Sequence, residues 1–350
     1  MQATTKKIFR AALWACAVLG ILAGAFLAHL IYIGEPSRAN SLQFQGFVLL
    51  PKSTMLTVLD YLTVSDKRLF VTDESGGNVY KIVLHDNALP SDADVSVFAS
   101  EPAAHGVAID PASGLAYVTR SEANTVDIFD PEKMIAIKRI AVAGDADAIL
   151  FDSFHNVVYV ANGDPRHATL ISPQTREMVG FIPLGGKPEF AVLDAQTELL
   201  YQNLQDINAV VEIDLSKRSV VQGWTLSGCV APSGMAIDEV GRRLFIACNG
   251  NAMLAIFDLK EHRVISSIPI GGGPDSVAFD PALHSIYTTG KAGVLSVIHQ
   301  DSFDTYHVLD SIKLHYGAHT LTVDPRTHAL YVAYASLLVR PRIAVFAPRP

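Results

Sequence analysis

Seven residues recur along the sequence at intervals of 42 or 44 positions, and most of them carry groups that do chemistry in proteins. They are two histidines, three carboxylates, a serine and a tyrosine: Tyr61, His105, Asp147, Glu189, Ser233, Asp275 and His319. Carboxylates suit hard cations such as calcium, whereas histidines recruit zinc or another transition metal. The same groups could bind a small molecule or a protein partner, act as general bases, or be solvated polar side chains. We predict a ligand-binding set, with a divalent metal as one candidate ligand.

Motifs for bound cofactors and for nucleophilic catalysis are absent from the sequence. It contains no C-x-x-C-H for covalent haem, no Gly-rich phosphate loop and no G-x-S-x-G nucleophile elbow. No catalytic triad can be identified from spacing, because any chain of this length contains scattered serine, histidine and aspartate. We therefore assign no catalytic residue and no haem or nucleotide cofactor, and whether the protein is an enzyme stays open.

An aspartate follows each member of the set by five residues, so the sequence from the first copy onward is periodic. These anchor aspartates are Asp66, Asp110, Asp152, Asp194, Asp238, Asp280 and Asp324. Seven positions after six of them stands an aromatic residue: Tyr117, Tyr159, Tyr201, Phe245, Tyr287 and Tyr331. The first copy departs from this pattern, because Phe70 follows Asp66 by only four positions.

Each copy contains four short runs typical of β-strands. In the copy that begins at Pro232 these are "GMAID", "RLFIAC", "MLAIFDL" and "RVISSIPI", separated by turn residues. Four strands in a period of about 40–45 residues indicate one blade of a β-propeller. The chain is therefore expected to be all-β, a seven-bladed propeller of four-stranded antiparallel blades spanning residues 41–350.

The two ends of this region predict how the ring closes. The last copy has only three strands, and "SLQFQGFVLL" near the N-terminus is a strand that belongs to no complete copy. Pairing them completes the seventh blade and removes exposed sheet edges. The recurring set then lies where each innermost strand begins, so we expect its members at one mouth of the central channel.

The repeats resemble the YVTN-type β-propeller repeat of bacterial periplasmic and secreted proteins. The resemblance rests on "GLAYVTRSEANTVDIFDPEKMIAIKRIAVAG" and "PDSVAFDPALHSIYTTG" and covers about residues 41–350. It implies the propeller fold. It also implies one of three kinds of function, because such propellers include binding proteins, electron-transfer partners and lactonase-like enzymes.

The N-terminal forty residues predict a membrane anchor. Residues 11–33 are a 23-residue run without Asp, Glu, Lys or Arg, long enough as a helix to cross a bilayer core of roughly 30 Å. Lys6, Lys7 and Arg10 precede it, which favours a cytoplasmic N-terminus. We predict a cytoplasmic segment 1–10, a single-pass transmembrane signal anchor 11–33, a linker 34–40 and a body outside the inner (cytoplasmic) membrane, in the periplasm or the extracellular space. The alternatives are a cleaved signal peptide with secretion and a buried core helix.

The cysteines predict one disulfide in the exported body. Cys16 belongs to the anchor, which leaves Cys229 and Cys248 as the two cysteines of the propeller. Cys229 lies in the connection into one blade and Cys248 ends that blade's second strand, so both return to the same rim. Adjacent antiparallel strands bring Cα atoms to about 5.5 Å, within disulfide range. The alternative is a pair of buried free thiols.

Charge excludes one class of partner and leaves the others open. The chain carries −8 at pH 7 with a pI near 5.8, and removing the three basic tail residues leaves 35 acidic against 24 basic residues, or −11. A nucleic-acid backbone needs a basic surface, so we expect no nucleic acid as a partner.

We predict a membrane-tethered binding or interaction module for a small ligand or protein partner. The alternatives are a lactonase-like propeller hydrolase and a subunit or partner of a periplasmic redox system.

Overall fold

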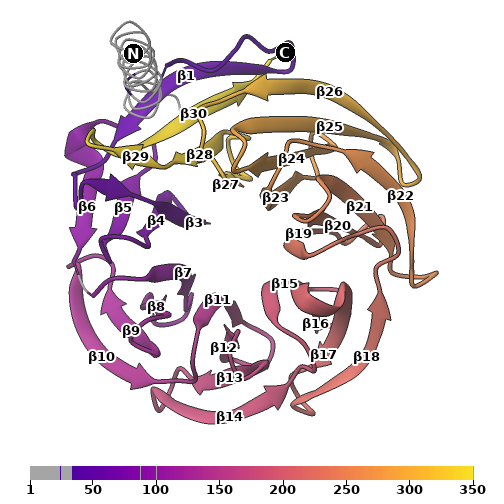
Figure 1. Cartoon of the computed structure of the whole chain (residues 1–350). Helices are drawn as coiled ribbons and strands as arrows, with labels where there is room; N and C mark the ends of the chain where they lie inside the picture. Colours follow the sequence, from indigo (N-terminus) through magenta and orange to yellow (C-terminus); the bar gives the residue numbers. More distant parts are fainter. Residues whose placement is uncertain (1–23, 25–33, 87, 100, 350) are drawn as a thin grey trace, which may run out of the picture.

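The computed structural model describes Gly24 and residues 34–86, 88–99 and 101–349. Within these residues, thirty strands form seven four-stranded antiparallel sheets and one two-stranded ribbon. Figure 1 shows the seven sheets arranged as blades around one axis. This confirms the predicted all-β, seven-bladed propeller.

The strands take equivalent places in successive blades. The innermost strands are β3 (Leu59–Ser65), β7 (Ala104–Ile109), β11 (Ala146–Asp152), β15 (Pro188–Asp194), β19 (Pro232–Asp238), β23 (Pro274–Asp280) and β27 (Thr320–Val323). The second strands are β4 (Arg68–Asp73), β8 (Ala116–Arg120), β12 (Val157–Asn162), β16 (Leu199–Leu204), β20 (Arg243–Cys248), β24 (Ser285–Gly290) and β28 (Leu330–Tyr334). The third strands are β5 (Val79–Val83), β9 (Thr125–Asp130), β13 (His167–Ser172), β17 (Ala209–Asp214), β21 (Met253–Asp258), β25 (Val294–Ser302) and β30 (Arg342–Pro348).

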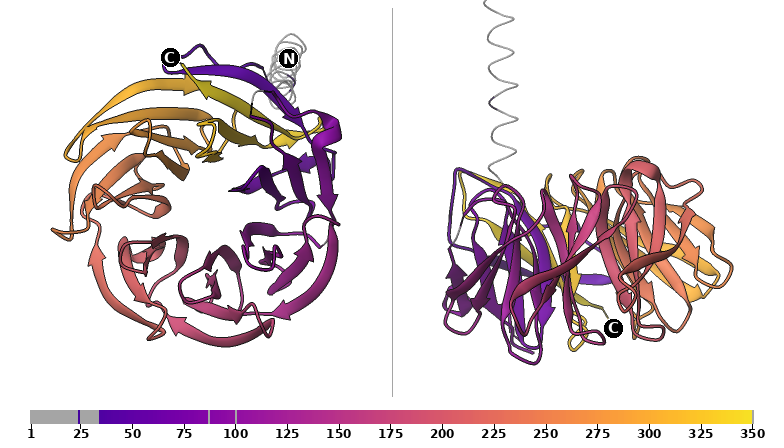
Figure 2. Two further views of the ribbon diagram at one scale, coloured as in Figure 1. Left: turned by 180° about the vertical axis from the view of Figure 1, so that it is seen from behind. Right: turned by 90° about the horizontal axis from the view of Figure 1, so that it is seen from below.

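Outer strands and short elements complete the blades. The outer strands are β6 (Val95–Phe98), β10 (Ile135–Ala141), β14 (Glu177–Pro183), β18 (Ser219–Thr225), β22 (Arg263–Pro269), β26 (Thr305–Lys313) and β1 (Leu42–Leu49). The ribbon pairs β2 (Leu56–Thr57) with β29 (Ser336–Leu337), and the 3₁₀ helices are η1 (Asp92–Asp94) and η2 (Gln205–Ile207). All seven innermost strands begin at one face of the disc. We call the face where the innermost strands begin the mouth rim, and the opposite face the far rim. Figure 2 shows the disc from behind and from the side.

The ring closes through the two ends of the propeller sequence. β1 pairs antiparallel with β30 from Leu42 opposite Pro348 to Leu49 opposite Arg342, and the seventh blade has the order β1-β30-β28-β27. Both views of the ribbon show β1 and β30 side by side. The seventh blade therefore combines segments from opposite ends of the chain, and this pairing covers an otherwise open sheet edge.

The repeated aspartates shape the turns at the far rim. Asp152 accepts hydrogen bonds from the backbone N–H of Phe154 and His155 at 2.8 and 3.2 Å, and Asp194 likewise accepts one from Gln196 at 3.0 Å. Such side-chain-to-backbone bonds stabilise tight turns between antiparallel strands. Asp66 does not share this role. It lies in the turn itself with φ of 53°, and Ser65 pairs with Arg68 at the end of β3.

The repeated aromatic residues form the core between blades. Phe70, Tyr117, Tyr159, Tyr201, Phe245, Tyr287 and Tyr331 are all buried on the second strands. Phe245, for example, packs on Phe279 of the next blade with ring centroids 5.0 Å apart. One aromatic per blade thus locks each sheet to its neighbour.

The two cysteines of the propeller form a disulfide. Cys229 and Cys248 have Cα atoms 5.2 Å apart and are joined through their sulfurs. Cys248 ends β20 at the mouth rim, opposite Pro232 at the start of β19. The bridge therefore ties the connection entering the fifth blade to the end of that blade's second strand.

The predicted anchor, residues 11–33, lies outside the described residues except for Gly24, as does the basic segment 1–10. Among the described residues, no helix is long and apolar enough to cross a membrane. The described chain resumes at Gly34. Ser37 then donates its N–H to the carbonyl of Lys313 at 2.9 Å, and its hydroxyl accepts from the Lys313 N–H at 2.8 Å. Lys313 ends β26 at the mouth rim, so the segment that follows the predicted anchor meets the propeller on that side.

Candidate ligand-binding site at the channel mouth

A β-bulge presents the recurring residue in six of the blades. In the second blade, Ala104 pairs with Arg120 and Val107 with Val118, so His105 and Gly106 together face Thr119 alone. The first and third to sixth innermost strands show register shifts at the same place. A bulge turns a side chain away from the direction that it would have on a regular strand. The same β-bulge therefore shapes the channel mouth in six of the seven blades.

The first blade corrects the sequence prediction by one residue. Its register places Phe70 opposite Thr63, as Tyr117 is opposite Ala108. Counting back from this pairing puts Asp60, and not Tyr61, in the position of His105. The alignment of Asp66 with the anchor aspartates was wrong by one residue, because the first blade has a shorter turn. The prediction that Tyr61 belongs to the binding set is not tested by this register.

Buried side chains from neighbouring strands hold the bulges in place. Thr320 donates to the carbonyl of Asp60 at 2.7 Å, and Thr119 donates to the carbonyl of Asp147 at 2.6 Å. Both bonds run from one blade to the next. These contacts satisfy carbonyls that the bulges remove from strand pairing, and they fix the geometry of the mouth before any ligand arrives.

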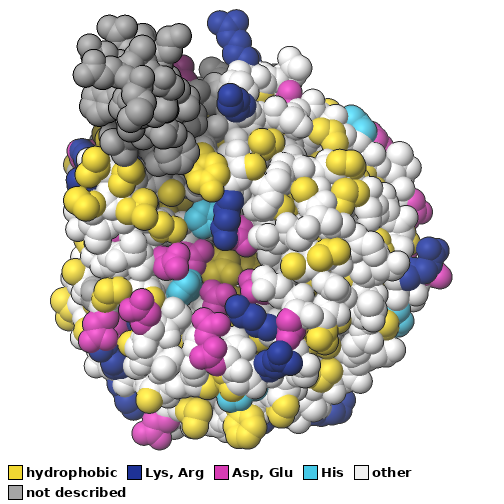
Figure 3. Space-filling view, viewed as in Figure 1, with side chains coloured by type: hydrophobic (Ala, Val, Ile, Leu, Met, Phe, Trp, Pro, Cys, Tyr) yellow, Lys and Arg dark blue, Asp and Glu magenta, His cyan; other side chains and the backbone are white. Residues whose placement is uncertain are grey.

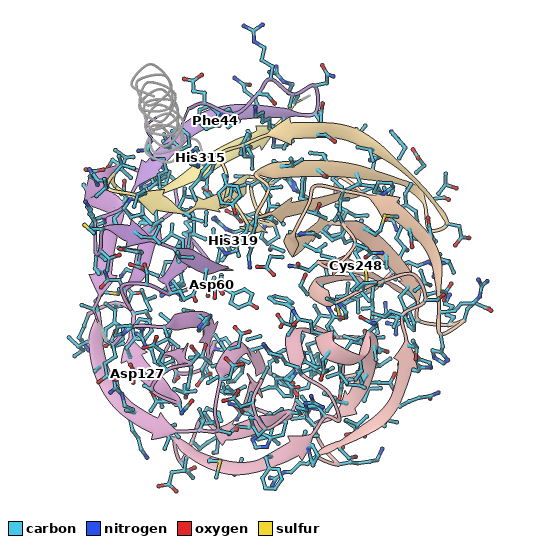
Figure 4. All side chains as sticks on the ribbon, viewed as in Figure 1. Phe44, Asp60, Asp127, Cys248, His315 and His319 are labelled. Carbon is cyan, nitrogen blue, oxygen red and sulfur yellow. A yellow bond between two sulfur atoms is a disulfide. The ribbon has the colours of Figure 1, made fainter. Side chains whose placement is uncertain are left out.

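Asp60 and two members of the set, His105 and Asp147, meet at one side of the mouth. His105 Nδ1 lies 2.6 Å from Asp60 Oδ2 and 3.5 Å from Asp147 Oδ1, and its Nε2 lies 2.9 Å from the hydroxyl of Ser121. All four side chains come from the first three blades. Figure 4 labels Asp60 near the inner end of its blade, facing the axis. We call Asp60, His105 and Asp147 the acidic triad.

Two more carboxylates face the same mouth from the fourth and sixth blades. Glu189 lies 3.9 Å from the ammonium of Lys187, and Asp275 lies 3.8 Å from that of Lys291. Both pairs are at the limit of an ion pair, so they neutralise the carboxylates weakly. Figure 3 shows acidic, basic and histidine side chains gathered around a hollow at the centre of this face.

The other two predicted members contribute little to the mouth. Ser233 is buried and donates to the carbonyl of Pro274 in the next blade at 2.8 Å. His319 is buried beside the start of β27, where its Nδ1 contacts the carbonyl of Gly317 at 3.0 Å. Figure 4 places it near the axis. His319 acts there as a nearby charge that lowers the pKa of Asp275 against the larger opposing effect of burial.

Burial and mutual repulsion shift the proton affinities of the mouth. Burial, reinforced by the charge of Asp60, raises the pKa of Asp147 to about 7 in spite of His105. Burial and the charge of Asp147 raise the pKa of Glu189 to about 8. Burial also opposes the charged form of His105, but the hydrogen bond and charge of Asp60 outweigh it and raise its pKa to about 9. The mouth therefore holds protons at neutral pH that a bound cation would displace.

Two aromatic rings meet across the channel near these groups. Tyr61 of the first blade reaches Phe190 of the fourth blade, with ring centroids 5.5 Å apart. The pKa of Tyr61 is raised by burial and then by the charges of Asp147, Asp60 and Glu189, so its hydroxyl is within electrostatic range of the carboxylates. Because the two blades stand on opposite sides of the axis, the contact crosses the channel. We call the space between the carboxylates of Asp60, Asp147, Glu189 and Asp275 and the Tyr61–Phe190 pair the cup, and the two rings its aromatic floor.

Three residues of the cup were not predicted from the sequence. Asp60 was one position from the predicted Tyr61, and aligning the first copy by Phe70 instead of Asp66 would have found it. Ser121 is the first residue after β8, at the mouth rim, and no repeated residue type marks that position. Phe190 follows Glu189 on the bulge. Its contact with Tyr61 depends on the width of the central channel, which the sequence does not give.

Comparison with solved structures supports the fold. The chain is similar to a structure described as Kuenenia stuttgartiensis hydrazine synthase, with a TM-score of 0.70 at 17% sequence identity. The match covers 85% of this chain and 99% of that chain. Likeness at this level of identity shows a common fold only. No protein-family model and no curated protein matches the sequence, so the YVTN-type resemblance stays a prediction.

Proposed function

We propose that the protein is a binding module that holds a positively charged ligand in the cup at its channel mouth. The observation that carries this proposal is the convergence of Asp60, Asp147, Glu189 and Asp275 above the Tyr61–Phe190 floor. The ligand is a small cation or a cationic side chain of a protein partner.

The energetics of the cup favour a cation. Removing a carboxylate from water costs several kcal/mol unless an opposite charge compensates it, and His105 is the positive group within ion-pair distance of the triad carboxylates among the described residues. A ligand cation would supply the missing charge to Glu189 and Asp275. The aromatic floor adds a favourable surface, because a cation over an aromatic face gains about 0.5–2 kcal/mol.

The test measures the Tm of the full chain by thermal melting in the presence of Zn²⁺, Ca²⁺, spermidine or choline. At a hundredfold excess over Kd a bound cation should raise Tm by roughly 5 °C. Binding should weaken roughly tenfold from pH 8.5 to pH 6, because Asp147 and Glu189 take up protons in this range.

A matched pair of variants locates the effect. Glu189→Gln should lose at least tenfold in affinity, since a charged contact is worth about 1.5–3 kcal/mol. Glu261→Gln makes the same change in the turn after β21 at the far rim and should bind normally. Equal affinities for the two variants, or no stabilisation by any cation, would refute the proposal.

We further propose that the propeller is tethered outside the cytoplasmic membrane by residues 11–33. The support is the length and apolar character of that run and the disulfide of the body, because disulfides persist in oxidising compartments. The meeting of Ser37 with Lys313 would then turn the mouth rim toward the membrane. A charged ligand would be captured on that side.

A second candidate, hydrolysis, is favoured by one specific arrangement. Ser121 Oγ, His105 and Asp60 form a hydrogen-bonded series in the order nucleophile, base and orienting carboxylate. The pKa of His105 near 9 keeps the imidazole protonated at neutral pH, so it would accept the serine proton efficiently only in alkaline solution. The redox alternative has no specific contact in its favour within the described residues.

Hydrolysis predicts a reactive serine. A fluorophosphonate should phosphonylate Ser121 with loss of fluoride, at a rate that rises between pH 7 and pH 9 as His105 loses its proton. Mass spectrometry of the labelled peptide measures this, and His105→Gln should abolish it. An unmodified Ser121 at pH 9 would remove the hydrolytic candidate and leave the binding function untouched.

A further inference from the structure

We propose that Asp60, His105 and Asp147 together bind one divalent transition-metal ion. This inference rests on the proposed binding of cations at the mouth and names a ligand class and the residues that hold it. The ion would occupy the side of the cup formed by the first three blades.

The donor atoms already converge. One ligand atom from each of the three side chains lies within 4.8 Å of the other two, and all three side chains are buried or half-buried. His105 Nδ1 is the centre of the group, at 2.6 Å from an Asp60 oxygen and 3.5 Å from an Asp147 oxygen. A tetrahedral ion with bonds of about 2.0–2.2 Å needs its donors a little over 3 Å apart. Small side-chain movements would therefore suffice.

The imidazole is oriented as a metal ligand requires. Without the ion, Nδ1–H donates to Asp60 at 2.6 Å; a bound ion would displace this proton and take the Nδ1 lone pair. Nε2 lies 2.9 Å from the hydroxyl of Ser121, so an Nε2–H can donate to Ser121 in that state. Histidine ligands in proteins commonly donate their other ring N–H to such a partner, and this fixes the tautomer. Ser121 is thus a positioning residue and does not bind the ion itself.

The donor set selects the kind of ion. Two carboxylates and a neutral imidazole carry a charge of −2, which a divalent cation neutralises. The nitrogen donor favours zinc, manganese or iron over calcium, which takes six to eight oxygens. Additional oxygens are scarce, because the carbonyls of Asp60 and Asp147 accept hydrogen bonds from Thr320 and Thr119. Fewer protein ligands would leave a coordination position open to the cup.

The experiment uses the full chain, stripped by chelator and titrated with Zn²⁺ by calorimetry, with Co²⁺ absorption as a spectroscopic check on nitrogen ligation. We expect one ion to bind at the triad. Asp60→Asn and Asp147→Asn should each weaken binding roughly a hundredfold, and Ser121→Ala roughly tenfold. Glu261→Gln, the far-rim control used above, should leave the Zn²⁺ affinity unchanged. Circular dichroism verifies that each variant is folded, and His105→Gln substitutes for any variant that is not.

A second group of histidines needs its own control. The ring of His299 in the sixth blade makes edge contacts with those of His284 and His307, at centroid distances of 6.4 and 5.6 Å. Exposed histidines of this kind also bind Zn²⁺, so the titrations are repeated in the His299→Ala/His307→Ala background. The triad ion should persist there.

The outcomes separate this inference from the proposed function. Normal Zn²⁺ affinity in both Asp60→Asn and Asp147→Asn would overturn the metal site. Absence of Zn²⁺ binding, together with Glu189-dependent stabilisation by spermidine or choline, would also overturn it while leaving the binding function standing. Loss of response to every cation would refute both.

Discussion

Replacing Phe245 with alanine should lower the free energy of unfolding by about 3–5 kcal/mol. Phe245 is fully buried, and its ring packs on Phe279 and Tyr306 with centroids 5.0 and 6.0 Å away. The substitution leaves a cavity between the fifth and sixth blades that the closed ring cannot collapse easily. Chemical denaturation followed by circular dichroism measures the loss.

An exposed phenylalanine provides the control for this prediction. Phe154 lies in the turn after β11 and is 44% exposed. Phe154→Ala should change the free energy of unfolding by no more than about 0.5 kcal/mol. Equal losses at the two sites would show that the repeated aromatic residue does not hold the blades together.

Removing the disulfide should cost about 2–4 kcal/mol. The bridge closes a loop between residues 19 apart, and both cysteines are buried, so Cys229→Ala/Cys248→Ala removes the constraint with little new cavity. A reducing agent should destabilise the wild-type chain by a similar amount and leave the double variant unchanged. A free energy of unfolding of the wild-type chain that is the same with and without the reducing agent would contradict this account.

The same cysteines test the compartment. Mass spectrometry of protein taken directly from cells, alkylated without reduction, should find Cys229 and Cys248 joined. Two freely alkylated cysteines would contradict both the disulfide and the proposed location outside the cytoplasmic membrane.

The fold could be predicted because each blade repeats residues with a local physical role. An anchor aspartate accepts hydrogen bonds in its own turn, as Asp152 does, and an aromatic such as Phe245 fills the space beside the next sheet. These roles depend on position within one blade. The repeat of one blade in the sequence is therefore enough to predict the strands of each blade and the number of blades.

The site could be predicted only in part, because it depends on differences between blades. Period alone located His105, Asp147, Glu189 and Asp275 at one mouth. It also included Ser233, whose side chain turns to the carbonyl of Pro274. Period could not reveal the contact of Tyr61 with Phe190, since that contact joins side chains of blades far apart in the ring.

The most direct test of cation binding in the cup uses terbium, a carboxylate-binding ion that luminesces when a nearby tyrosine transfers excitation energy to it. The charges of Asp147, Asp60 and Glu189 act on the hydroxyl of Tyr61, so we expect a cation held by these carboxylates to be close to this ring. Titrating Tb³⁺ into the full chain with tyrosine excitation should give saturable emission. Tyr61→Phe should abolish most of that emission while Tb³⁺ still raises the Tm of the variant. Undiminished emission from Tyr61→Phe would place the bound cation elsewhere and contradict the central claim.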